Sequence, residues 1–153
     1  MSSTAETNQV RRDTKRKIIT NCAHSILVCL GRTYMDEEYY PIYDERIHRM
    51  SKELPQEVSD IEILEFMTKI DRKFRFPSEI YVSSIIYMDR LAMNSNIYLK
   101  RTNWKRIVLI SLLVSAKYTL ERPVYNNDVV EVFPQIRMGD LISLEKQFLY
   151  HIE

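Results

Sequence analysis

The chain has 153 residues, with 22 basic and 21 acidic side chains and a formal net charge of +1. This length suits one domain with a substantial core, and the balanced charge argues against a general attraction to nucleic acid. Only two glycines and five prolines occur, and helix-forming residues are common. The composition therefore favours an all-α fold over a sheet fold.

The first 57 residues contain one predicted helix. Residues 1–14 are polar, and we expect them to form a disordered basic N-terminus. The basic cluster at residues 11–17 is interpreted as a solvated helix start, with a nuclear address or a phosphate contact as alternatives. Over residues 15–57 we expect an N-terminal helix, which Gly31 ends, and then an acidic, tyrosine-rich connecting segment.

Capping residues and the spacing of apolar residues predict four more helices around a central one. Ser59 and Glu62 form a capping box before the first, and the second opens at Ser78. A short helix over residues 128–132 can be capped by Asn126 or Asn127, and the last helix begins near Met138. The residues expected to face inward share helical spacing: Ile63, Phe66, Met67 and Ile70; Val82, Ile85, Ile86, Met88 and Ala92; and Leu141, Leu144, Phe148, Leu149 and Ile152.

The central helix is predicted over residues 103–118. From Ile107 to Ala116 it is apolar on every side apart from Ser111 and Ser115, and this run is too short to cross a membrane. A helix that is hydrophobic all round belongs in the centre of a bundle. The central helix ends in polar residues, so we expect Lys117 to lie at the surface.

Two acidic residues interrupt apolar stripes. Glu145 falls among the inward residues of the last helix, and Asp89 falls among those of the helix that opens at Ser78. A carboxylate on an apolar face is costly unless it is paired. The residues alone leave three interpretations: an internal ion pair, a helix rotated by one residue, or a carboxylate that acts with Lys117 on a partner.

The sequence shows no motif for catalysis, for metal or phosphate binding, or for secretion. The three histidines are scattered, neither glycine lies in a phosphate-binding loop, and no serine or cysteine lies in a nucleophile motif. We therefore expect no catalytic residue, metal or cofactor. No signal peptide is visible, and Ser2 excludes N-myristoylation. The expected location is intracellular, cytoplasmic or nuclear or both, without a membrane anchor.

Three separated strings carry a resemblance to a known family. They are IYMDRLAMN, NWKRIVLISLLVSAKYTLERPVYNNDVVEVFPQI and MGDLISLEKQFLYHI, and together they resemble a cyclin box, more narrowly that of the cyclin Y family. The upstream strings RKIITNCAHSILVCL and IYDERIHRM are similar to the segments that precede the box there. The resemblance implies a single five-helix cyclin-box bundle over residues 58–153, with a preceding N-terminal helix and residues 103–118 as the third helix of the box.

The resemblance also implies a function. Lys117 and Glu145 match the lysine and glutamate with which cyclins grip a kinase, and Tyr118 and Glu121 are expected beside them. The chain would be a non-enzymatic regulatory subunit that binds and activates a cyclin-dependent kinase, most similar to the PCTAIRE or PFTAIRE type, by packing on its αC helix. A cyclin-fold adaptor that binds a kinase or scaffold without activating it is one alternative. A cyclin fold that contacts nucleic acid is another, which the near-neutral charge disfavours.

The sequence departs from the family pattern at several points. Val124-Tyr125 stands where the family has an aromatic residue followed by tryptophan. In many cyclins an arginine of the first box helix pairs with the aspartate that matches Asp89; here that helix offers only Lys69, Arg72 or Lys73. The sequence stops in the fifth box helix, so we expect the second cyclin fold to be missing.

Overall fold

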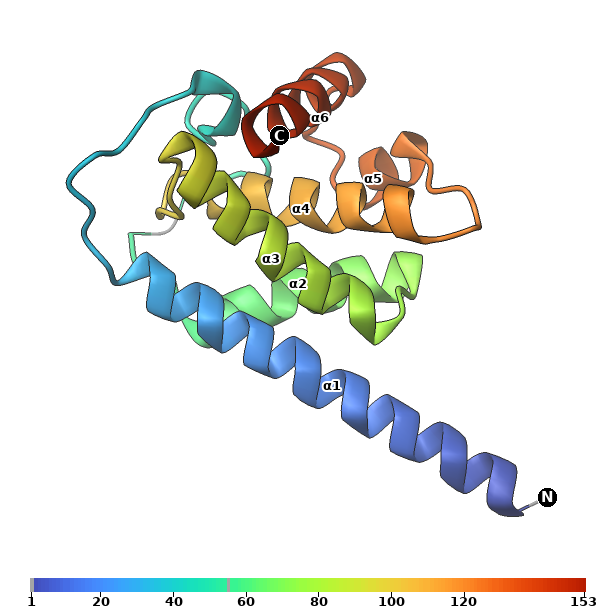
Figure 1. Ribbon diagram of the computed structural model, residues 1–153. Coiled ribbons are helices and arrows are strands. Elements are labelled where there is room, and N and C mark those ends of the chain that lie inside the picture. Colours follow the sequence, from blue (N-terminus) through green and yellow to red (C-terminus); the bar gives the residue numbers. More distant parts are fainter. Residues whose placement is uncertain (1, 55) are drawn as a thin grey trace.

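The computed structural model describes residues 2–54 and 56–153 and contains only helical elements over those ranges. The helices are α1 (Ser2–Leu30), α2 (Asp60–Phe74), α3 (Ser78–Ser95), α4 (Trp104–Thr119), α5 (Asn126–Val132) and α6 (Met138–Ile152), with a 3-10 turn, η1, at Pro41–Tyr43. Helix α4 runs through the middle of the bundle with the others around it (Figure 1). The predicted all-α fold, with five helices after an N-terminal one, is confirmed.

Helix α4 is the buried centre that the sequence predicted. Every residue from Trp104 to Ala116 is buried, and the helix packs against α3, α6 and η1. Ser111 is fully buried, and its hydroxyl donates to the carbonyl oxygen of Ile107 at 2.6 Å. This bond satisfies the serine within its own helix, so a small polar side chain fits in an apolar core.

Helix α1 begins at Ser2, so residues 2–14 are helical where disorder was expected. No glycine or proline interrupts residues 2–30, and the backbone hydrogen bonds of a helix are local, so it continues without tertiary support. Residues 3–14 are exposed, and this half of α1 extends away from the bundle (Figure 1). The other half packs against α2 and α3 through Ile19, Cys22, Ala23 and Ile26.

The predicted start of α2 is correct, whereas the predicted inward face of α3 is only partly so: Met88 is buried and Ile85 partly buried. The Ser59 hydroxyl oxygen accepts a hydrogen bond from the backbone N–H of Glu62 at 3.2 Å, as in a capping box. In α3 the buried residues are Ile80, Tyr81, Ser84, Met88 and Leu91. Val82 and Ile86 are exposed, because the helix is rotated to bury the Tyr81 ring, whose hydroxyl donates to Asp71 on α2.

The same rotation corrects the prediction for Asp89. Its side chain is exposed on α3, and it makes no ion pair with any residue that the structure describes. Of the interpretations that the sequence left open for this residue, the rotated helix is therefore correct. The short helix α5 also differs in detail, since Tyr125 rather than an asparagine occupies its N-cap.

The connecting segment after α1 is tied to the bundle. Arg106 of α4 is almost fully buried; its Nε donates to the carbonyl oxygen of Ile42 at 2.7 Å and its Nη1 to that of His48 at 3.3 Å. Tyr43 and His151 share a hydrogen bond of 2.8 Å between the hydroxyl and Nδ1. These contacts fix η1 between the start of α4 and the end of α6.

Candidate functional site

Lys117 and Glu145 come together at one edge of the bundle. Lys117 Nζ lies 2.9 Å from Glu145 Oε1 and donates a hydrogen bond to Asn126 Oδ1 at 2.7 Å. Three helices therefore meet at this ammonium group: α4 supplies Lys117, α5 supplies Asn126 and α6 supplies Glu145. The two charged side chains are about one-fifth exposed, 22% and 21%, so a partner could still reach them.

The local sequence explains why both charges lie at the boundary of the core. Lys117 directly follows the buried run of α4, at the point where that helix leaves the core. Glu145 follows the buried Leu144 and precedes the buried Phe148 on α6. A carboxylate in this position needs a partner, and Lys117 provides one. The internal ion pair, one interpretation of Glu145, is therefore present in the isolated chain.

The ion pair keeps unused hydrogen-bonding capacity. A lysine ammonium has three donors, and two of them face Glu145 and Asn126. Glu145 Oε2 accepts no hydrogen bond from the described residues. The pair can therefore offer one N–H donor and one carboxylate oxygen to a further group while it stays intact.

Apolar and aromatic residues adjoin this polar pair or its asparagine partner in the sequence, or lie about one helical turn from the pair. Tyr118 is 69% exposed, Tyr125 60% and Ile142 41%, and Leu149 is partly buried on the same helix as Glu145. On α6, Ile142, Glu145 and Leu149 follow helical spacing along one face. Exposed rings and aliphatic chains around a half-buried ion pair are typical of a protein–protein contact.

Glu121 does not join this group. It lies after the end of α4, is exposed, and lines a cleft on the side of α1 together with Arg122. Of the four residues expected at the site, the structure thus brings Lys117 and Glu145 together, leaves Tyr118 exposed next to them, and places Glu121 toward a different surface.

Asp44, Glu45, Lys105 and Arg106 are buried charged residues that the sequence reasoning missed, and two of them stand out. Burial lowers the pKa of the Arg106 guanidinium to about 10. This side chain holds the connecting segment through its hydrogen bonds to the carbonyl oxygens of Ile42 and His48. Glu45 is 4% exposed, and burial raises the pKa of its carboxyl group to about 7. Neither carboxylate oxygen has a hydrogen-bond partner among the described residues. Arg106 directly precedes the apolar run, which was a signal; nothing in the irregular pattern around Glu45 indicated its burial.

The described residues contain no group of three or more histidine, cysteine or acidic side chains that could hold a metal ion. None of their helices combines the length and apolar character needed to cross a membrane. Cys22 and Cys29 are both free thiols.

Comparison with known proteins shows which family this chain is similar to. The family model described as cyclin matches residues 3–153. Two curated relatives are Cyclin-U2-1 and Cyclin-U2-2 of Arabidopsis thaliana, each 26% identical over 96 residues, or 62% of this chain. The aligned region covers 43% and 41% of those two proteins, so the chain spans about two-fifths of their length. No solved structure matches significantly.

Proposed function

Because the chain belongs to the cyclin family, we propose that it binds and activates a cyclin-dependent protein serine/threonine kinase. Members of this family regulate kinases and are not enzymes themselves. The observation that carries the proposal is the half-buried ion pair between Lys117 and Glu145, with its unused donor and acceptor and its apolar surroundings.

The proposed contact uses the spare capacity of the pair. Lys117 donates its third hydrogen to a kinase backbone carbonyl, and Glu145 Oε2 accepts from a kinase backbone N–H. The bond to Asn126 and the intrachain ion pair hold both groups in place beforehand, which lowers the entropy lost on binding. Tyr118, Tyr125 and Ile142 supply most of the affinity by burying apolar surface.

Activation follows from differential binding. A kinase whose αC helix is rotated outward does not make the lysine–glutamate ion pair that positions the ATP phosphates. A rigid surface that packs on the inward αC helix binds that state more tightly and shifts the population toward it. The rigidity of the proposed surface comes from the buried run of α4 from Trp104 to Ala116, against which α3 and α6 pack.

The bounds of the cyclin box, the subfamily and the type of kinase are proposed from the sequence strings that resemble a cyclin box. We propose that residues 58–153 form the cyclin box, that the chain is closest in type to the cyclin Y family, and that its kinase is of the PCTAIRE or PFTAIRE type. The matched order of several separated strings supports this. The proposed location is cytoplasmic or nuclear or both, without nucleic-acid binding.

A kinase assay with and without the purified chain tests the proposal. The expected result is capture of a PCTAIRE-type kinase together with a rise in its activity. Capture without a rise would favour the adaptor alternative, and absence of capture with every kinase of both types would refute the proposal. Salt-dependent binding to DNA would instead support the nucleic-acid alternative.

A further inference from the structure

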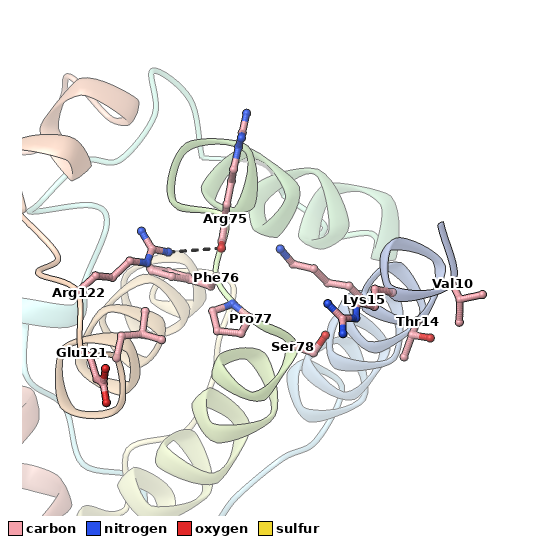
Figure 2. A pocket seen from close by; sticks show the side chains of 11 residues that line it. Val10, Thr14, Lys15, Arg75, Phe76, Pro77, Ser78, Glu121 and Arg122 are labelled. Carbon is pink, nitrogen blue, oxygen red and sulfur yellow. Dashed lines mark hydrogen bonds between the residues drawn. The ribbon is translucent and has the colours of Figure 1, made fainter. Parts of the chain in front are cut away.

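A cleft of about 710 Å³ lies between the exposed half of α1, the corner that joins α2 to α3, and the residues after α4. Figure 2 shows it from close by, with Val10, Thr14 and Lys15 on one side and Arg75, Pro77 and Arg122 on the other. Its lining is mostly apolar, and Phe76 at its base is fully buried. The basic cluster of α1, which the proposed function leaves unexplained, forms part of its wall.

Positive charge is concentrated where α1 faces the start of α3. Arg11 lines the cleft and has no ion pair with any described residue. Lys15 lies 2.6 Å from Asp71 Oδ1, so its ammonium group is held in place and keeps two further donors. In Figure 2 the Lys15 side chain extends from α1 toward the α2–α3 corner. An anion in this part of the cleft would lie near the unpaired guanidinium of Arg11 and the fixed ammonium of Lys15, whose charge Asp71 partly balances.

The first turn of α3 adds donors to the same place. Its N-cap is Pro77, which provides no side-chain acceptor, and Ser78 at the first helical position lines the cleft. The backbone N–H groups of Ser78 and Glu79 therefore lack a side-chain cap and favour negative charge, whereas that of Ile80 donates to the carbonyl oxygen of Pro77 at 3.0 Å. Figure 2 places Ser78 and Lys15 on facing sides.

Hydrogen bonds and ring stacking hold the corner between α2 and α3. Arg122 Nη2 donates to the carbonyl oxygens of Phe74 at 2.6 Å and Arg75 at 3.4 Å, so it closes the end of α2. The rings of Phe74 and Phe76 stack with centroids 5.0 Å apart. Among the described residues, Glu121 is the single carboxylate that lines this cleft. The corner thus presents a fixed apolar surface with positive charge at one end and one negative charge at the other.

We propose that this cleft docks a phosphorylated peptide segment of a partner protein. The phosphate lies between Arg11, Lys15 and the first turn of α3, and an apolar side chain of the peptide packs on Pro77 and Leu120. A dianionic phosphate with three acceptor oxygens matches two cations and a set of N–H donors better than a carboxylate does. The hollow shape excludes a flat bilayer, and the apolar lining does not suit a nucleic-acid backbone.

The test measures fluorescence anisotropy of a labelled peptide pool titrated with the full chain. Each peptide carries one fixed phosphoserine flanked by leucine, with the other positions varied, and the same pool without phosphate is the reference. We expect binding of the phosphorylated pool only. Arg11→Glu should weaken it about tenfold or more because a charge-assisted contact becomes a repulsion. Glu121→Gln should strengthen it by removing the only carboxylate in the lining.

Two variants make the test specific. Ser78→Asp puts a carboxylate in the first turn of α3, where it favours the helix, so binding should disappear while thermal stability is kept or raised. Arg12→Glu makes the same charge change as Arg11→Glu one residue along α1, at a position that does not line the cleft, and should leave binding nearly unchanged. Several outcomes would overturn the proposal: equal losses in Arg11→Glu and Arg12→Glu, no preference for the phosphorylated pool, or tighter binding of single-stranded DNA or phosphatidylserine vesicles than of the pool.

Discussion

Replacing Glu45 by glutamine should change how the stability of this protein depends on pH. Glu45 is buried in the connecting segment, where its backbone N–H donates to the carbonyl oxygen of Thr102 at 2.8 Å while its carboxylate oxygens have no partner among the described residues. Burial is the main cause that raises its pKa from 4.5 to about 7. Lys105 and Arg106 oppose this rise, and Glu62 and Asp44 add to it.

The direction of this pH dependence follows from the difference in proton binding between the folded and unfolded states. The folded state holds the Glu45 proton more tightly than the unfolded chain, so the protonated carboxyl favours folding. Its contribution is fully present below about pH 4.5 and is lost as the pH rises through about 7. The corresponding free energy is about 3 kcal/mol at most. Glutamine cannot ionise, so above pH 7 Glu45→Gln should be more stable than the wild type by up to about that amount.

Urea unfolding, followed by far-ultraviolet circular dichroism near pH 5 and pH 8.5, measures this difference. We expect the difference between variant and wild type to be small at the lower pH and to grow at the higher pH. Glu65→Gln, at an exposed position on α2, is the control and should show no such growth. A glutamine variant that is less stable than the wild type at pH 8.5 would show that Glu45 is ionised and paired, and would refute the reasoning.

Three further substitutions test the packing. Ser111→Leu should overpack the centre of α4 and lower the free energy of unfolding by about 1–3 kcal/mol; an unchanged melting temperature would show that this helix is not central. Arg106→Met should cost about 2–4 kcal/mol because the carbonyl groups of Ile42 and His48 lose a charged donor, and faster hydrogen exchange in the connecting segment would report it. Ser59→Ala should cost about 1 kcal/mol in urea unfolding, because it removes the cap of α2.

Helix positions were predictable because their signals are local. The capping box at Ser59 and the continuous apolar run after Arg106 each specify structure within a few residues. The edge position of Lys117 also followed from the sequence, since the apolar run ends beside it. These features need no knowledge of what packs against them.

Features set by tertiary contacts were harder to predict. The rotation of α3 depends on Tyr81, whose ring is buried and whose hydroxyl reaches Asp71 on α2, a partner that periodicity cannot identify. The burial of Glu45 depends on how the connecting segment folds over α4. The ion pair between Lys117 and Glu145 joins residues 28 positions apart in sequence (145 − 117), so pattern alone left it open.

The central proposal is that Lys117 and Glu145 bind a kinase. Capture of a PCTAIRE-type kinase by Lys117→Ala and by Glu145→Ala, measured beside the melting temperature of each variant, tests it most directly. We predict complexes weaker by about 2–5 kcal/mol, because each change strands a polar partner at the interface. Stability should change by only about 1 kcal/mol or less, since the pair is partly exposed.

Lys100→Ala provides the matched control. Lys100 precedes α4 at the end opposite Lys117, and it too forms an ion pair, with Glu37. Its removal should leave both kinase capture and stability nearly unchanged. Normal capture by Lys117→Ala and Glu145→Ala together with a clear loss of melting temperature would mean that the pair serves only the fold, and would contradict the proposed kinase contact.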